Sequence, residues 1–281
     1  MSEQNSDGDT PLHVAVKAAL GVAVGEKPLG EEVGIHTDCS SEVSTTLDII
    51  LSHAKDSGII AAQHLHNADG HMPIHIAAGR GNVPICEALL LAGAPVNART
   101  VQQGELHNGQ WGKKDEDGNI KELATANKTA LHLALDLLHE QAEEEEDAVL
   151  DTRLVCLLLK RGADTNALDI ENQMPLHIAI DGGMHELVEL LVEAKADMNL
   201  GVKGNTALHQ ATMLRDVRMV KLLTNHGAPI DCTGRDGWTP LGLAVRSGAT
   251  HTAKALLEAR ANVHTAAGRG KSSLEIAALN K

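Results

Sequence analysis

The fold is decided by two blocks of sequence, TALHQA at Thr206–Ala211 and VKLLTNHGAPID at Val220–Asp231. The first block recurs as TPLHVA from Thr10, MPIHIA from Met72, TALHLA from Thr129, MPLHIA from Met174, TPLGLA from Thr239 and, more weakly, SSLEIA from Ser272. The second recurs as CEALLLAGAPVNA from Cys86, VCLLLKRGADTNA from Val155, LVELLVEAKADMN from Leu187 and AKALLEARANV from Ala253. The starts at 174, 206, 239 and 272 are 32, 33 and 33 residues apart, so one structural unit is repeated.

A period near 33 residues, with TPLHxA and a later LLxxGAxxN, resembles the ankyrin repeat over nearly the whole chain outside three insertions. The resemblance implies an all-α fold: an α-solenoid of about six to seven repeats, each with two antiparallel helices and a projecting β-finger. We expect a single ankyrin-repeat domain over residues 1–281. The expected repeats are 5–66, 67–98, 124–168, 169–200, 201–233, 234–266 and a partial repeat at 267–281.

The residue types within each block fit two packed helices. A Thr that begins the first block can cap a helix, and the Pro after it suits the first helical position. Met72 and Met174 take the place of this Thr, which should cost roughly 1 kcal/mol of capping in each repeat. The Leu of the block and the Ala three residues later share one helix face.

The end of the second helix is marked in three repeats by a glycine, at Gly93, Gly162 and Gly227. Glycine suits the left-handed position that follows many helices. Lys195 and Arg260 occupy the equivalent places in two other repeats, so we expect strained or differently closed turns there.

The composition favours many thin aliphatic layers over one large core. The 281 residues include no Phe, no Tyr and two Trp, whereas a large core normally uses aromatic volume. The formal charge of −14 and the lack of a basic run disfavour nucleic acid and anionic membranes as partners. The four cysteines are far apart and form no CxxC pair, which argues against a disulfide framework or a zinc site. We therefore expect a reducing compartment, the cytoplasm, with the nucleus as the alternative.

The first residues, MSEQNSDGDT, are polar and acidic and do not resemble a signal peptide. The apolar stretch Leu12–Val24 contains Lys17 and is far shorter than the ~20 residues of a membrane helix. We expect no direct membrane insertion, and a monomer.

Three insertions interrupt the repeats, at about 21–46, 99–126 and 139–151. Exposed turns accept extra length at small entropic cost, so tolerated insertion is the plain interpretation of each. Trp111 lies within GQWGKKDEDGN in the second insertion, which falls in a finger, and an exposed Trp is typical of binding hot spots. The EEEED run at 143–147 is either a solvated helix extension or a docking site for a basic partner.

Four histidines fall within HLHNADGHMPIH at His64–His75, which raises the question of a metal site. The fourth place of the first block holds five histidines, His13, His75, His132, His177 and His209. The resemblance implies a structural role for them, with hydrogen bonds near the turn between repeats. Layers roughly 10 Å apart keep them too far from one another to share an ion with bonds of ~2.0–2.1 Å. His64 and His66 could still share one face if HLH is extended, so metal binding or contact with a partner stays open for this pair.

The patterns of the common catalytic and nucleotide-binding sites are missing. GRGKSS at Gly268–Ser273 ends like a phosphate-binding loop, but Thr265 stands where that motif needs Gly, and no strand precedes it. HExxH, GxSxG and EF-hand patterns are absent from the sequence. We expect no catalytic residue, no cofactor and no metal, and therefore not an enzyme.

The resemblance implies recognition of protein partners through finger tips and the exposed faces of the first helices. The candidate residues are Asp69, His71, Arg80, Trp111, Glu171, Gln173, Asp181, Lys203, Asn205, Met213, Leu214, Asp236, Trp238 and Arg246. Trp238 is the best candidate anchor, and packing flat on the neighbouring finger is the equal alternative. We expect a non-catalytic scaffold or adaptor. The alternative is an ankyrin regulatory segment of a larger multidomain enzyme, channel or transferase.

Overall fold

A computed structural model describes most of the chain, in the ranges 4–21, 62–101, 105–107, 110–114, 120–122, 127–144, 150–202, 204–267 and 270–279. The chain divides into two compact units. Unit 1 contains Met1–Leu137 and Asp151–Asp164, and unit 2 contains Leu138–Leu150 and Thr165–Lys281. The single domain expected over 1–281 stays a prediction. Within the described residues, no helix combines the length and apolar character needed to cross a membrane.

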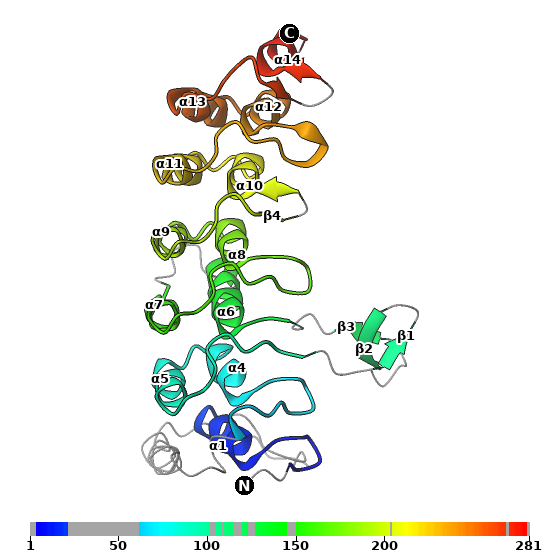
Figure 1. Cartoon of the computed structure of the whole chain (residues 1–281), viewed down its shortest axis with the longest axis vertical. Coiled ribbons are helices and arrows are strands. Elements are labelled where there is room, and N and C mark those ends of the chain that lie inside the picture. The colour runs from blue at the N-terminus through cyan, green and yellow to red at the C-terminus, as the bar shows by residue number, and fades with distance from the viewer. Residues whose placement is uncertain are drawn as a thin grey trace. The chain divides into compact units, whose positions relative to one another are not determined.

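Unit 1 is built from helix pairs with a small sheet on the finger side (Figure 1). Its elements are α1 (Pro11–Ala19), α4 (Pro73–Ala78), α5 (Val83–Leu91), β1 (Glu105–His107), β2 (Gln110–Lys114), β3 (Ile120–Glu122), the first half of α6 (Ala130–Glu144) and α7 (Arg153–Lys160). The helix α4 packs on α1 and α5, and α5 packs on α7. This arrangement places first helices against first helices and second helices against second helices.

Unit 2 repeats the same pattern with shorter fingers (Figure 1). Its elements are α8 (Pro175–Asp181), α9 (His185–Glu193), β4 (Gly201–Val202), β5 (Asn205–Thr206), α10 (Ala207–Met213), α11 (Val217–Asn225), the 3₁₀ turn η1 (Arg235–Gly237), α12 (Pro240–Arg246), α13 (Thr250–Glu258), β6 (Ala266–Ala267), β7 (Lys271–Ser272) and α14 (Ser273–Leu279). The first helices α8, α10, α12 and α14 pack in succession, and so do the second helices α9, α11 and α13.

The core consists of thin layers of aliphatic side chains. The Leu or Ile of the first block is 3% exposed or less in Leu12, Ile74, Leu131, Leu176, Leu208 and Leu241. One leucine of each second helix is fully buried, in Leu89, Leu158, Leu191, Leu223 and Leu256. Burying a side chain of this size contributes roughly 1.5–3 kcal/mol. Because every layer reuses the same two positions, the fold needs no Phe or Tyr.

The helix ends follow the sequence closely. The hydroxyl groups of Thr10 and Thr239 accept hydrogen bonds from the amides three residues later, whereas Met72 and Met174 provide no such cap. At the other end of the repeat, Lys195 and Arg260 have φ angles of +69° and +68°. The left-handed region costs an L-residue about 1 kcal/mol, so the expectation of strained turns there is confirmed.

Two of the expected insertions have described structure. Within 99–126, β1, β2 and β3 form an antiparallel sheet whose backbone register pairs Leu106 with Trp111 and Lys113 with Lys121. The two ends of this insertion are joined at its base, where the Thr100 amide donates to the Lys128 carbonyl oxygen at 2.8 Å.

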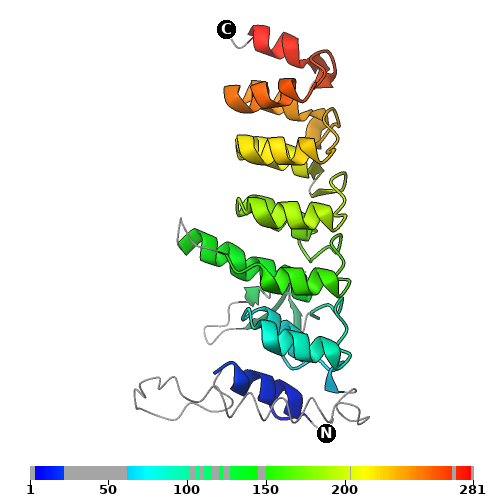
Figure 2. The ribbon, with the colours of Figure 1, turned by 90° about the vertical axis from the view of Figure 1, so that its left-hand side faces the viewer.

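The insertion at 139–151 begins as a continuation of α6, which is 15 residues long, compared with 7 in α8 (Figure 2). A helix extension therefore accounts for the EEEED run as far as Glu144. Residues 145–149 lie outside the described residues, as does the insertion at 21–46 apart from Gly21.

Candidate functional site

We call the five histidines of the first block the motif histidines, and three of them, His13, His75 and His209, connect their helix to a finger. The Nδ1 atom of His75 accepts the Met72 amide at 3.0 Å. In His13, His132 and His209, Nδ1 accepts the amide of the preceding Thr at 3.2–3.3 Å and lies 2.7–2.8 Å from its hydroxyl. The imidazole therefore closes the N-terminus of the first helix in these repeats, including that of His75, where Met72 replaces Thr.

The opposite ring nitrogen reaches the next finger. Nε2 of His13 donates to the His71 carbonyl oxygen at 2.9 Å, and Nε2 of His75 donates to the Ala98 carbonyl oxygen at 3.0 Å. In unit 2, Nε2 of His209 donates to the Trp238 carbonyl oxygen at 2.9 Å. Because Nδ1 accepts and Nε2 donates, each of these rings is neutral and in one tautomer.

Burial reinforces the neutral state. Desolvation lowers the pKa of His75 from 6.5 to about 4, although the Ala98 carbonyl opposes the shift. Desolvation likewise lowers the pKa of His177 to about 4, against an opposing effect of the Asn205 carbonyl. Neither ring nitrogen of His177 reaches a hydrogen bond of standard geometry with the described residues, so the Asn205 contact is looser than its counterparts. The pKa values of His13 and His209 are also lowered by burial.

The motif histidines do not gather around one point. Within the part of the chain that the structure describes, no group of three or more His, Cys, Asp or Glu side chains could hold a metal ion. The HLH stretch does not form an extended strand, because Gln63 and His64 lie in a turn. His64 is exposed, and Nε2 of His66 lies 3.1 Å from the Arg99 carbonyl oxygen of the neighbouring finger.

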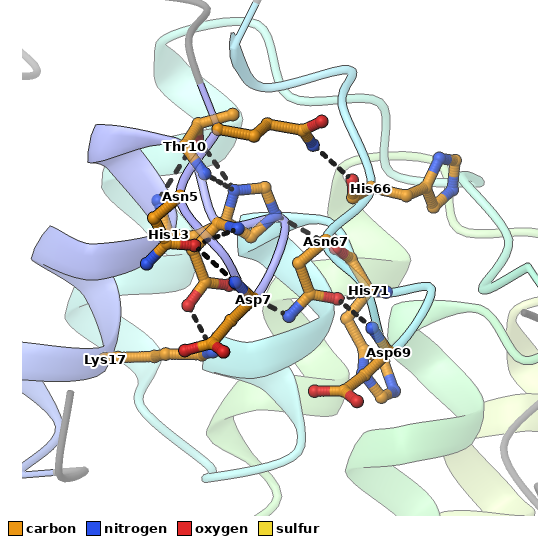
Figure 3. A network of polar contacts seen from close by, with 11 residues as sticks. Asn5, Asp7, Thr10, His13, Lys17, His66, Asn67, Asp69 and His71 are labelled. Carbon is orange, nitrogen blue, oxygen red and sulfur yellow. Dashed lines mark hydrogen bonds and ion pairs between the residues drawn. The ribbon is translucent and has the colours of Figure 1, made fainter. Parts of the chain in front are cut away.

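The fingers of unit 1 are closed by short side chains and joined through their tips (Figure 3). The Oδ1 atom of Asn67 accepts the amides of Asp69 and His71 at 3.0 and 2.9 Å. The Ala68 amide donates to the Asp7 carbonyl oxygen at 2.9 Å, and the Val101 amide donates to the Gly70 carbonyl oxygen at 3.0 Å. A Cβ at Gly70 would lie 1.9 Å from the Val101 carbonyl oxygen, so this contact needs glycine.

A buried ion pair lies at the base of the first finger (Figure 3). Lys17 Nζ is 2.6 Å from Oδ2 of Asp9, whose side chain is 1% exposed. The Nδ2 atom of Asn67 donates to Asp9 Oδ1 at 3.1 Å. The carboxylate is thus paired and hydrogen-bonded, as a buried charge must be.

Asp9 and Lys17 show a register that recurs in other repeats. The residue before the first block contacts the residue eight positions later, on the first helix that follows. Lys128 Nζ lies 2.6 Å from Asp136 Oδ2, and Asn205 Nδ2 lies 3.8 Å from Met213 Sδ. The Arg246 guanidinium carbon lies 4.9 Å from the centre of a Trp238 ring. We call these contacts the i/i+8 pairs. Two of them lie in unit 1 and two in unit 2, and the two in unit 2 consist of residues that the sequence marked for partner binding.

The candidate partner-binding residues differ in how far their side chains are exposed to solvent. Asp69, Arg80, Glu171, Asp181, Met213, Leu214 and Arg246 are exposed. His71, Gln173, Asn205 and Trp238 are half-buried, so the expectation of open tips is corrected for these four. The His71 ring meets the His75 ring edge-on with centroids 6.4 Å apart. Lys203 lies outside the described residues, as do the side chains of Trp111 and Asp236.

Four of these candidates, Met213, Leu214, Trp238 and Arg246, lie in two consecutive repeats of unit 2 whose first helices α10 and α12 pack together. With Arg235, which precedes Trp238 in the same finger, they form a surface that we call the α10–α12 face. Met213 and Arg246 hold equivalent places at the ends of two packed first helices. Met213 is 60% and Leu214 49% exposed, so two consecutive large apolar side chains are open to solvent at the end of α10. The face joins apolar surface, an aromatic ring and positive charge.

Sequence reasoning missed Arg235 and the i/i+8 pairs. The Arg235 amide donates to Asn205 Oδ1 at 3.0 Å, which fixes one finger against the next. Oppositely charged residues eight apart around the first block, as in Asp9 and Lys17, were the available signal. Arg246, a residue of the same repeat, lies over the Trp238 ring.

Comparisons with known proteins match this repeat architecture. A family model for ankyrin repeats in three copies matches residues 147–234 and 215–281, and a model for the single ankyrin repeat matches residues 69–101. The B-cell lymphoma 3 protein homolog of Mus musculus is 29% identical over 252 residues, which cover 85% of this chain and 49% of that protein. The nuclear factor NF-kappa-B p105 subunit of Gallus gallus is 30% identical over 198 residues, 68% of this chain and 16% of that protein.

A channel protein is also among the relatives. The transient receptor potential cation channel subfamily A member 1 homolog of Caenorhabditis elegans is 26% identical over 195 residues, 68% of this chain and 16% of that protein. The chain thus spans between 16% and 49% of the length of these three relatives. The crystal structure of the ankyrin repeat domain of Bcl-3 superposes with a TM-score of 0.67 at 21% identity, over 96% of this chain and 95% of that one. The expected all-α repeat fold is confirmed, and the chain belongs to the ankyrin-repeat family.

Proposed function

We propose that this chain is a non-catalytic scaffold or adaptor that binds a polypeptide partner through its fingers and first-helix faces. Ankyrin repeats mediate protein–protein interaction, and the proposal assigns that role to particular residues of this chain. The observation that carries it is the α10–α12 face, where α10, which ends at exposed Met213 and Leu214, packs on α12, which carries Arg246 over the Trp238 ring. Trp, Met and Arg are enriched in the cores of interfaces.

A structural use for the motif histidines supports the non-catalytic part of the proposal. A general base needs a ring nitrogen that faces substrate. In His13, His75 and His209, one nitrogen accepts a backbone amide and the other donates to a carbonyl. We place the protein in the cytoplasm, with the nucleus as the alternative, and expect a monomer.

A regulatory segment of a larger protein is the second candidate function. It is favoured by one observation: this chain spans 16% of the NF-kappa-B p105 subunit and of the channel homolog. In such a setting the α10–α12 face would bind another part of the same polypeptide.

The proposal is tested by affinity capture from a cell extract, with the partners identified by mass spectrometry. The test variant is Met213→Asp/Trp238→Ala, and the matched control is Leu257→Asp, which changes an apolar residue that is 47% exposed on the second helix α13. We expect the double variant to lose the partners that the control retains. Both variants must unfold thermally like the unchanged chain. Equal recovery of every partner by all three proteins contradicts the proposal.

A further inference from the structure

The i/i+8 pairs differ in one respect that bears on the partner's chemistry. In Asp9–Lys17 and Lys128–Asp136, opposite charges lie 2.6 Å apart, so each pair is neutral. In Trp238–Arg246 the same register joins a cation to an uncharged ring. Within the described residues, no carboxylate lies in ion-pair range of Arg246. As far as these residues are concerned, the positive charge of Arg246 is available to an external group.

The indole also holds the guanidinium ready to bind. An exposed arginine normally loses side-chain freedom when it forms an ion pair, which weakens the pair. Stacking on Trp238 at 4.9 Å restricts Arg246 in advance and leaves the edge of the planar group accessible. The Arg215 Nη2 atom donates to the carbonyl oxygen of Ser247 at 2.8 Å, which places a second guanidinium at the backbone of the residue that follows Arg246.

Apolar surface adjoins this charge on the neighbouring helix. Met213 occupies in α10 the place that Arg246 occupies in α12, and packed helices lie about 8–10 Å apart. Leu214 follows Met213 and is 49% exposed. A ligand that spans this distance needs an anionic group at one end and an apolar group at the other.

We propose that the α10–α12 face binds a short acidic segment of a protein partner, with a carboxylate on Arg246 and an apolar side chain on Met213 and Leu214. This inference rests on the proposed function and names the chemistry of the partner. Planar guanidinium and carboxylate groups form paired, charge-assisted hydrogen bonds. In extended peptides, side chains on one face recur about every 7 Å, which lets one acidic and one apolar residue reach the two helices.

Nucleic acid is the competing class of ligand, since a Trp–Arg stack could also hold a base and a phosphate. The formal charge of −14 opposes the approach of a long polyanion. A short acidic segment carries less charge and gains the apolar contact that a phosphate backbone lacks. The polypeptide is therefore the ligand that fits.

The test uses the full chain with Trp111→Phe, so that Trp238 is its only tryptophan. The probes are a short peptide in which Asp or Glu and Leu stand two residues apart with Ser between them, so that both share one face of the extended chain, the same peptide with Lys at the acidic places, the same peptide with Ala for Leu, and a single-stranded oligonucleotide. Binding is followed by Trp238 emission and by isothermal titration calorimetry. The protein variants are Arg246→Gln, Arg246→Lys and the control Arg218→Gln, an exposed arginine on the second helix α11.

We expect the acidic Leu peptide to bind most tightly and to change the Trp238 emission. Arg246→Gln should weaken it about tenfold, a loss typical of a hydrogen-bonded charge pair, while Arg246→Lys restores part of the affinity and Arg218→Gln changes nothing. Tighter binding of the Lys peptide or of the oligonucleotide overturns the inference, and so does equal binding to Arg246→Gln. If the acidic-segment inference is overturned but capture from extract still depends on Met213 and Trp238, the proposed protein-binding function stands. If capture does not depend on them either, the proposed function and the acidic-segment inference both fail.

Discussion

Nε2 of His75 lies 3.0 Å from the carbonyl oxygen of Ala98, and this hydrogen bond ties the first helix of one repeat to the finger that follows its second helix. The same ring accepts the Met72 amide through Nδ1. One neutral imidazole thus satisfies two backbone groups that would otherwise be buried without partners. The stability of the fingers is therefore linked to the protonation state of the motif histidines.

Acid should destabilise the fold between pH 6.5 and pH 4. The pKa values of His75 and His177 are about 4 in the folded chain against 6.5 in the unfolded one, so the unfolded chain binds more protons in this window. The contribution is complete above pH 6.5 and is lost as the pH falls toward 4, by at most about 3 kcal/mol for each histidine. Urea unfolding at pH 7 and pH 5 measures the loss. His75→Gln/His177→Gln should flatten the pH dependence and exposed His64→Gln should not; equal slopes in all three proteins would contradict the prediction.

Removal of Asp9 should cost about 3 kcal/mol of unfolding free energy, because Lys17 is left as an unpaired, largely buried charge and the Asn67 amide loses its acceptor. The matched control is Asp151→Ala. Asp151 also lies 2.6 Å from an arginine, but the side chains of that pair are 47% and 78% exposed, so its loss should cost no more than about 1 kcal/mol. Chemical denaturation of Asp9→Ala and Asp151→Ala compares the two, and similar losses would refute the ranking.

The turns after two second helices should accept glycine with a gain in stability. Lys195→Gly and Arg260→Gly remove left-handed strain at φ +69° and +68°, and each should raise the unfolding free energy by about 0.5–1 kcal/mol after the entropic cost of glycine. Gly227→Ala provides the reverse change, since its φ is +84° and no atom lies within 4 Å of the added Cβ. It should destabilise by a similar amount. A fall in melting temperature for both glycine variants would show that the lysine and arginine side chains contribute more than the strain costs.

Much of the fold could be predicted because the same residue types recur at the same positions in several repeats. Burial at Leu176 and Leu208, and strain at Lys195 and Arg260, follow from residue type and position alone. Periodicity is a local property of the chain, so it is visible without a structure.

The candidate site was only partly predictable, because its geometry depends on how a finger folds back over its own helix. Met213 and Leu214 are exposed as their helix positions indicated. Trp238 is half-buried because Arg246, eight residues later, covers its ring. Helical periodicity relates residues three or four apart, and a finger residue lies outside that rule.

Gly234 should be intolerant of a side chain although its backbone is not left-handed. A Cβ there would lie 2.7 Å from Asn205 Oδ1 and from the His209 ring, which together hold the finger that presents Trp238. Gly234→Ala should therefore lower the unfolding free energy by about 1–3 kcal/mol through overpacking. Asn205→Ala removes one of the two contacts, so the loss in the double variant should be smaller than the sum of the single losses. If urea denaturation shows that the two single losses of unfolding free energy add fully in the double variant, the destabilisation by Gly234→Ala does not arise from the contact with Asn205.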